Sequence, residues 1–152
     1  MMKQTDVVII GARSLLANGS VVGAKGCGTV ACVANEDQGM LLVSSSDNFF
    51  LLRLVPVLVC CETYKFSERV QMDGIVSNEV ADPADLIKDK DGRPTLLEGW
   101  EEVDHMGVLN LSYDLTPQEF ITVIVTDVGN IPTTSVPVII REFIAEGVLD
   151  DQ

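Results

Sequence analysis

Hydrophobic residues along the chain fall into short runs separated by polar and glycine-rich segments. Residues 7–10 form a continuous aliphatic run that ends at Gly11, and residues 55–61 form a second run. Continuous aliphatic runs of this length are typical of strands buried on both faces, as in a parallel sheet. We therefore expect a central, doubly buried strand at 7–10 and another buried strand at 55–61.

Three further elements follow from the same pattern. A third strand is predicted at 108–113, VLNLSY, where alternating polar residues leave one face less buried. The segment 29–35, TVACVAN, is small and apolar and is predicted to be helical. Asn18 and Gly19 mark a turn before it.

The clearest helix signal lies near the C-terminal end. Thr116, Pro117 and Glu119 have the spacing of a capping box with proline at the first helical position. Apolar residues at helical spacing follow, and Gly129 can end the helix. This pattern predicts a helix over 117–128 and then a strand over 136–140. Strands alternating with helices predict an α/β domain, with a mainly parallel sheet flanked by helices.

We expect a single domain over 1–152. Two segments within it do not fit the alternation of strands and helices. Residues 37–53 separate a helix from the strand that it should feed, where connections of about two to six residues are usual. We interpret them as an insertion or, alternatively, as translated non-coding sequence. Residues 81–105 are acidic and interrupted by proline and glycine, so they are predicted to form a loop.

Charge excludes several classes of partner. The chain has a net charge of −13, and all of it falls in residues 61–152, which carry nineteen acidic and six basic side chains. Such a surface repels nucleic acid and anionic membranes. It either suits a basic protein partner or serves only as a solubilising surface. No apolar run reaches the length of about 18 residues that a membrane span needs. We expect a cytosolic protein with reduced cysteines and no direct nucleic-acid or membrane binding.

The cysteines offer little chemistry. Cys60 and Cys61 are adjacent on a predicted strand, so their side chains point to opposite faces and cannot chelate one metal. The only histidine, His105, lies in the acidic loop. We expect structural cysteines, with a reactive thiol at the strand end as the alternative, and no metal or cofactor site.

The glycine-rich stretch GSVVGAKGCGT at 19–29 leads into the first predicted helix. Its spacing matches neither GxxxxGK[ST] nor GxGxxG. Lys25 beside a helix N-terminus could hold a phosphate, or the stretch is a turn that packs the helix on a strand. Asp114 follows the third predicted strand, at the edge where open α/β sheets bind ligands. Its alternative role is a hydrogen bond to the turn into the next helix.

Three stretches together resemble the C-terminal domain of a known family, the regulatory alpha, beta and delta subunits of eukaryotic translation initiation factor 2B. They are DVVIIGARSLLANGSV at 6–21, VPVLVCCETYKFSERVQMDGIVSNE at 55–79 and LNLSYDLTPQEFITVIVTDVGNIPTTSVPVIIRE at 109–142. The motifs CCETYKFSERVQ and YDLTP…IPTTSVPV are similar to the delta type of subunit. The resemblance implies a Rossmann-like fold.

The same fold family contains sugar-phosphate isomerases, such as methylthioribose-1-phosphate isomerase. Those enzymes carry Gly-Ala-Asp-Arg with a catalytic aspartate where this chain has GARS at 11–14. Because Arg13 replaces the acid–base carboxylate, isomerase chemistry is predicted to be absent. The enzymes' Asn-Lys-Ile-Gly-Thr stretch matches 23–29, which keeps Lys25 and Thr29 but is two residues longer. Candidate residues for a phosphorylated ligand are Arg13, Asn18, Lys25, Thr29 and Asp114.

The resemblance implies a non-catalytic, delta-like regulatory and assembly subunit of the complex that exchanges GDP for GTP on initiation factor 2. The partners implied are other factor 2B subunits, above all a beta-like one, and initiation factor 2 through the assembled complex. The alternative is a sugar-phosphate-binding or isomerase protein. Family segments that would flank the strand at 7–10 have no counterpart in the sequence. We therefore expect an incomplete domain that is unstable or oligomeric alone.

Overall fold

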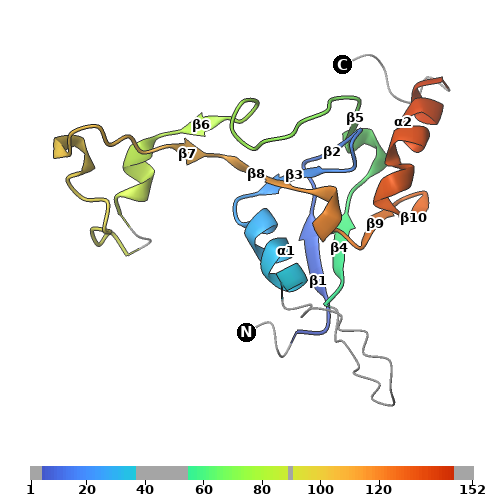
Figure 1. The fold of residues 1–152 in the computed structure, drawn as a ribbon, viewed down its shortest axis with the longest axis horizontal. Helices are drawn as coiled ribbons and strands as arrows, with labels where there is room; N and C mark the ends of the chain where they lie inside the picture. Colours follow the sequence, from blue (N-terminus) through green and yellow to red (C-terminus); the bar gives the residue numbers. More distant parts are fainter. Residues whose placement is uncertain (1–4, 37–54, 89–90, 146–152) are drawn as a thin grey trace, which may run out of the picture.

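The computed structural model describes residues 5–36, 55–88 and 91–145. Within them the chain forms two four-stranded sheets, a two-stranded ladder and two α-helices (Figure 1). The sheets and helices make up a body, from which the ladder projects. The predicted insertion at 37–53 lies outside the described residues. No helix in the described part of the chain is long and apolar enough to cross a membrane.

The first sheet contains the parallel core of the fold. Its spatial order is β1 (Val8–Gly11), β4 (Val57–Cys60), β9 (Val123–Thr126) and β10 (Gly129–Ile131). β1 is parallel to β4 and β4 to β9, whereas β10 is antiparallel to β9. The buried strand predicted at 55–61 is thus confirmed as β4. A mainly parallel sheet with helices beside it confirms the α/β class.

The second sheet is mixed. Its order is β5 (Phe66–Ser67), β2 (Ser14–Leu16), β3 (Val21–Ala24) and β8 (Tyr113–Thr116). β2 and β3 form an antiparallel hairpin, and β2 is parallel to β5. The predicted turn at Asn18 and Gly19 joins the hairpin strands, and Gly19 has a φ of +78°, which glycine adopts without strain.

Two helices flank the sheets. α1 (Cys27–Glu36) confirms the helix predicted at 29–35 and buries Ala31 and Ala34 against the core. α2 (Val136–Ala145) buries Val136 and Ile140. Phe143 of α2 lies 6.0 Å from Phe66 of β5 between ring centroids. The core joins both sheets and includes Val8, Ile10, Leu15, Val21, Val57, Val59, Ile124 and Ile131.

The helix predicted over 117–128 is wrong. Residues after β8 form only a 3-10 turn, η5 (Gln118–Phe120), and then strand β9. Thr116 ends β8 with its side chain fully buried, and it caps nothing. The run Val123–Thr126 is rich in β-branched residues, which favour strands. Its pairing with β4, a long-range contact, overrides the local capping signal.

Two predicted strands also change. Residues 136–140, predicted as a strand, begin α2, because Val136 and Ile140 are four positions apart and share one helical face. A 3-10 turn, η6 (Thr133–Ser135), leads into that helix. The strand predicted at 108–113 is divided between β7 (Asn110–Leu111) and β8, which belong to different sheets.

The strand at 7–10 is confirmed as β1, but it is neither central nor doubly buried. β1 lies at the edge of the first sheet. Val8 and Ile10 face the core, whereas Ile9 is 63% exposed. A continuous aliphatic run therefore does not distinguish an edge strand with one open face from a central one.

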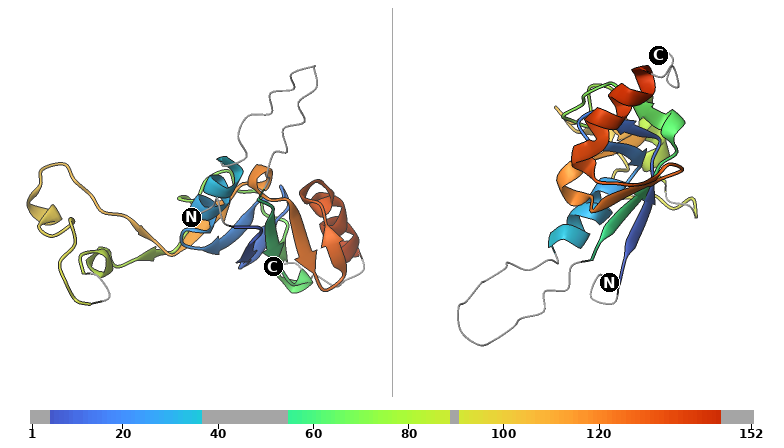
Figure 2. Two further views of the ribbon diagram at one scale, coloured as in Figure 1. Left: turned by 90° about the horizontal axis from the view of Figure 1, so that it is seen from below. Right: turned by 90° about the vertical axis from the view of Figure 1, so that its right-hand side faces the viewer.

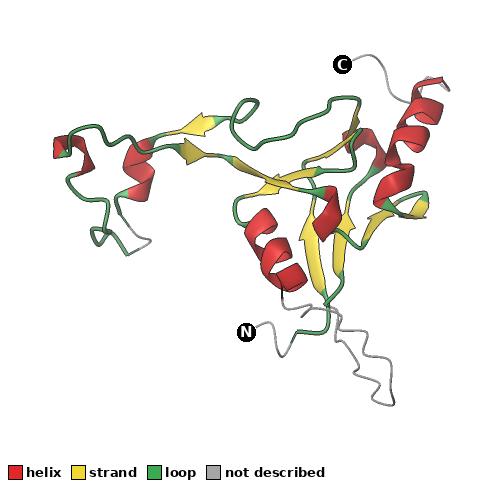
Figure 3. Ribbon diagram, viewed as in Figure 1, coloured by secondary structure: helices red, strands yellow, loops and turns green. Residues whose placement is uncertain are grey.

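We call the described residues within 79–112, that is 79–88 and 91–112, the arm, because they extend away from the body in Figures 1 and 2. β6 (Val80–Ala81) pairs antiparallel with β7 at its base. Two 3-10 turns, η3 (Pro83–Leu86) and η4 (Trp100–Glu102), lie farther out. The rest of the described arm is loop (Figure 3). The interpretation of 81–105 as one acidic loop of a single domain stays a prediction.

Candidate functional site

A cavity of about 340 Å³ opens where the parallel strands β1, β4 and β9 end. The carboxyl ends of parallel strands meet at one edge of a sheet, which is where α/β folds bind ligands. The walls of the cavity are formed by residues that end or follow these three strands. They are Gly11, Ala12, Cys60, Cys61, Glu62, Lys65, Val125, Thr126 and Asp127.

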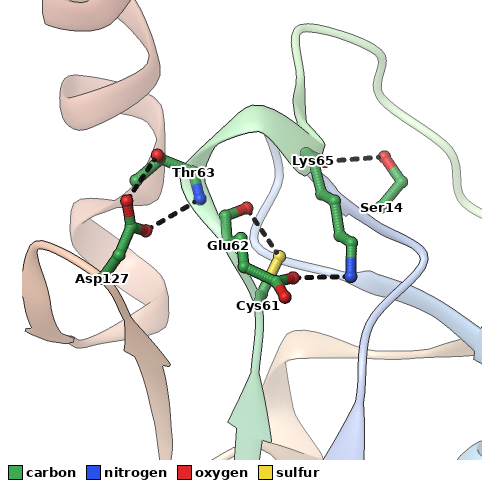
Figure 4. Close-up of polar contacts among 6 residues, drawn as sticks. All are labelled: Ser14, Cys61, Glu62, Thr63, Lys65 and Asp127. Carbon is green, nitrogen blue, oxygen red and sulfur yellow. Dashed lines mark hydrogen bonds and ion pairs between the residues drawn. The ribbon is translucent and has the colours of Figure 1, made fainter.

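Lys65 and Glu62 form an ion pair on one wall of the cavity (Figure 4). Both belong to the turn after β4 that contains η2 (Thr63–Lys65). The hydrogen bond between them raises the pKa of Lys65 and lowers that of Glu62, so both are charged at neutral pH. A ligand anion would have to compete with Glu62 for this cation.

Asp127 also lines the cavity and is joined to the same turn. Its carboxylate accepts hydrogen bonds from the Thr63 backbone N–H at 2.9 Å and from the Thr63 hydroxyl at 3.0 Å (Figure 4). The backbone hydrogen bond is the main reason why the pKa of Asp127 is lowered. The charged lining residues are therefore two carboxylates and one ammonium group. This balance does not favour an anion.

Cys61 is the buried thiol of the site. Burial raises its pKa to about 11, and its Sγ donates to the Glu62 carbonyl oxygen at 3.5 Å. A thiol with that pKa is protonated at neutral pH and is a poor nucleophile. Cys60 is exposed on the other face of β4, as the alternation of strand side chains predicts. Among the described residues no group of His, Cys, Asp and Glu could hold a metal ion.

None of the five residues proposed from sequence lines this cavity. The Arg13 guanidinium carbon lies 4.2 Å from the centre of the Tyr113 ring, and its Nη2 lies 3.3 Å from the Glu79 carboxylate. Asn18 holds its turn to the body by donating to the Gln71 carbonyl oxygen at 2.9 Å. Thr29 is exposed on α1.

Lys25 and Asp114 both make contacts close to the start of α1. Lys25 Nζ donates to Asn110 Oδ1 at 2.7 Å, and Asn110 Nδ2 donates to the Asp82 carbonyl oxygen at 2.7 Å. Asp114 accepts from the Gly28 backbone N–H at 2.9 Å, in the first turn of the helix. The hydrogen bond to a turn predicted for Asp114 thus goes to α1 rather than to a later helix.

Arg13 and Lys25 therefore both contact the base of the arm. Arg13 contacts Glu79, the first residue of the arm, and Tyr113, which directly follows the arm. Lys25 contacts Asn110 of β7. Their role in binding a phosphorylated ligand stays a prediction. In this structure they hold the arm to the body.

Sequence reasoning considered Cys60 and Cys61 but missed the charged residues that line the cavity. Glu62 and Lys65 follow a strand that was predicted, so the strand-end rule that selected Asp114 could have selected them. Asp127 could not be found in that way, because its segment was assigned to a helix. Nothing in the local sequence pairs Asp127 with Thr63, which is 64 residues away.

The fold and the cavity at its strand ends define a Rossmann-like α/β protein. A model of the Initiation factor 2 subunit family matches residues 52–133. The chain belongs to that family.

Relatives of two kinds match the chain. The chain is 41% identical to translation initiation factor eIF2B subunit delta of Dictyostelium discoideum, over 94% of this chain and 21% of the relative. It is 34% identical to the delta subunit of Schizosaccharomyces pombe, over 94% of this chain and 28% of the relative. It is 33% identical to ribose 1,5-bisphosphate isomerase of Pyrococcus furiosus, over 93% of this chain and 36% of the relative. The chain thus spans between about a fifth and a third of these relatives.

Solved structures confirm the fold. A 5-methylthioribose 1-phosphate isomerase from Pyrococcus horikoshii superposes with a TM-score of 0.65 at 20% identity, over 93% of this chain and 34% of that one. An eIF-2B delta subunit from A. fulgidus superposes with a TM-score of 0.64 at 22% identity, over 92% of this chain and 35% of that one. An eIF2B beta subunit from Chaetomium thermophilum superposes with a TM-score of 0.54 at 18% identity, over 93% of this chain and 29% of that one.

Proposed function

We propose that the chain is a non-catalytic, delta-like regulatory and assembly part of the complex that exchanges guanine nucleotide on initiation factor 2. The observation that carries the proposal is its 41% and 34% identity to two delta subunits, over 94% of the chain in each case. Its partners would be other factor 2B subunits, a beta-like one in particular. Initiation factor 2 would be met through the assembled complex, in the cytosol.

The chemistry of the described residues supports a non-catalytic role. Arg13, which stands where the isomerases that the chain resembles carry aspartate, is held between Glu79 and Tyr113. It cannot supply a carboxylate base. The buried thiol of Cys61 is protonated at neutral pH because its pKa is raised to about 11. Neither group offers the acid–base chemistry that an aldose–ketose isomerisation needs.

The second candidate function is a sugar-phosphate isomerase or binding protein. Two observations favour it, the cavity at the strand ends and the 33% identity to a ribose 1,5-bisphosphate isomerase. The carboxylates Glu62 and Asp127 on its walls argue against a phosphorylated ligand, because like charges repel.

One pair of assays separates the two functions. The chain is incubated with ribose 1,5-bisphosphate and, separately, with methylthioribose 1-phosphate, and product is followed by phosphorus NMR. A factor 2B complex assembled with or without the chain is then tested for GDP release from initiation factor 2. We expect no isomerisation and faster GDP release when the chain is present. Isomerisation together with unchanged GDP release would reject the proposal.

A further inference from the structure

The arm has no hydrophobic core of its own. Among described residues 68–88 and 91–109 not one side chain is buried, and the first buried residue after them is Asn110. Ordering a residue costs roughly 1–2 kcal/mol of backbone entropy, which burial of apolar surface normally offsets. The arm gains little such offset from its own side chains, which are at most partly buried up to Asn110. We therefore expect contact with another molecule to bury apolar surface of the arm and stabilise its conformation.

The ladder at the base of the arm turns one apolar face outward. Val80 is opposite Leu111, and Ala81 is opposite Asn110. Asn110 faces the body, where it is 3% exposed and accepts from Lys25. Side chains alternate along a strand, so Leu109 and Leu111 lie on the other face together with Val80. We call these three residues the outward face.

Two of the three residues of the outward face are exposed, and further apolar side chains are exposed elsewhere on the arm. Val80 is 66% exposed and Leu109 is 53% exposed. Large apolar side chains exposed farther out are Leu96, Val103 and Met106. Neighbouring apolar side chains left exposed on one face of a ladder, as Val80 and Leu109 are, are typical of an interaction site in soluble proteins.

Charge decides which kind of occupant fits. Residues 79–105 contain nine Asp and Glu against three Lys and Arg, a net charge of −6. A second copy of this chain brings the same charges and a total of −13, so like charges oppose self-association. Nucleic acids and anionic membranes are repelled for the same reason. A protein whose apolar surface is bordered by basic residues complements both the apolar and the acidic character of the arm.

We propose that the outward face of the arm docks onto a non-identical protein subunit whose apolar surface is bordered by lysines and arginines. The inference builds on the proposed function, because it names the surface through which the chain joins the assembly. Arg13 and Lys25 contribute indirectly, by holding the base of the arm in place.

The test uses the full chain and a purified beta-type subunit of factor 2B as the probe, with binding measured by biolayer interferometry. Leu109→Asp and Val80→Asp place a charge on the outward face. Val138→Asp is the matched control, because Val138 is 56% exposed on α2, outside the arm. We expect each arm substitution to weaken binding at least about tenfold, as at interface hot spots. The control should change binding less than about twofold.

Two further measurements need no apolar substitution. Hydrogen–deuterium exchange of the unaltered chain should slow on binding at residues 79–88 and 106–112. Raising the salt concentration should slow association, and it should do so less for the variant Glu101→Lys/Glu102→Lys, whose exposed carboxylates are reversed.

The outcomes separate this inference from the proposed function. Binding that both arm substitutions leave unchanged, with no slowing of exchange in the arm, overturns the docking surface and leaves the proposed function standing. A tight homodimer protected at the arm overturns the choice of a non-identical partner. Failure of the unaltered chain to bind the beta-type subunit contradicts both.

Discussion

Asp127 and Thr63 are joined by two hydrogen bonds, from the Thr63 backbone N–H at 2.9 Å and from its hydroxyl at 3.0 Å. Asp127 lies in the turn between β9 and β10, and Thr63 begins the turn after β4. The pair thus links the loops that follow two adjacent parallel strands. It fixes the rim of the cavity at the strand ends.

Asp127→Ala should destabilise the chain at neutral pH, because both hydrogen bonds to Thr63 are lost. The pKa of Asp127 is lowered in the folded state from its ordinary 3.8. Its stabilisation is therefore full well above pH 3.8 and is lost as the pH falls through the lowered value. Urea unfolding of both proteins at neutral pH and near pH 3 measures the difference. Glu119→Ala, an exposed site, is the control, and a difference that does not shrink in acid would contradict the assignment.

Thr116→Val should stabilise the chain. Thr116 is fully buried, and its hydroxyl has no hydrogen-bond partner within the described residues. An unsatisfied buried hydroxyl costs about 1–3 kcal/mol, so its removal should raise the free energy of unfolding by about 1 kcal/mol.

Thr122→Val is the matched control for Thr116→Val. The hydroxyl of Thr122 accepts a hydrogen bond from the Val57 backbone N–H at 3.0 Å. Its loss should lower the free energy of unfolding by about 0.5–1.5 kcal/mol. A loss of stability in Thr116→Val as well would show that its hydroxyl is bonded.

Cys61 should react slowly with thiol reagents near neutral pH, whereas Cys60 is exposed and accessible. Because the pKa of Cys61 is raised to about 11, its thiolate fraction should rise about tenfold per pH unit up to that value. Maleimide labelling of Cys60→Ser at several pH values, read by peptide mass, measures this. Rapid labelling of Cys61 at pH 7 would mean that the thiol is neither buried nor protonated.

Asn110→Ala should loosen the arm without unfolding the body. It removes the acceptor of Lys25 and the donor to the Asp82 carbonyl oxygen, each at 2.7 Å. Amide exchange should become faster at 79–82 and 110–113 and stay unchanged in β4. Asn130→Ala, at an exposed position of β10 outside the arm, is the control. Equal effects of the two substitutions on the arm would show that Asn110 does not hold it.

The sequence predicts well those elements whose pattern is local. The aliphatic run that became β4 and the small apolar segment that became α1 needed no distant partner for their prediction. The helix predicted over 117–128 was wrong because Thr116, Pro117 and Glu119 carry a local helix signal. The pairing of β9 with β4, which is a long-range contact, makes part of this segment a strand instead. The strand predicted over 136–140 was wrong because β-branched residues favour strands in isolation. Burial of one face of this segment makes it a helix instead.

The site was harder to predict than the fold. Lys25 was selected as a cation in a glycine-rich stretch beside a helix N-terminus, and Arg13 because it stands where the resembling isomerases carry aspartate. The structure gives each of them a partner at the base of the arm. The cavity depends on Asp127 meeting the turn after β4, which only the correct order of strands in the sheet reveals. Register and strand order are set by long-range contacts, so no short sequence window contains them.

Quantitative co-purification tests most directly whether the chain belongs to an exchange complex. The tagged chain is purified from its own cells, and the proteins that accompany it are identified and counted by mass spectrometry. Beta- and epsilon-like subunits of factor 2B should be recovered in stoichiometric amounts with the unaltered chain, and much less with Leu109→Asp. Recovery of the unaltered chain without any factor 2B subunit would contradict the assignment to the exchange complex.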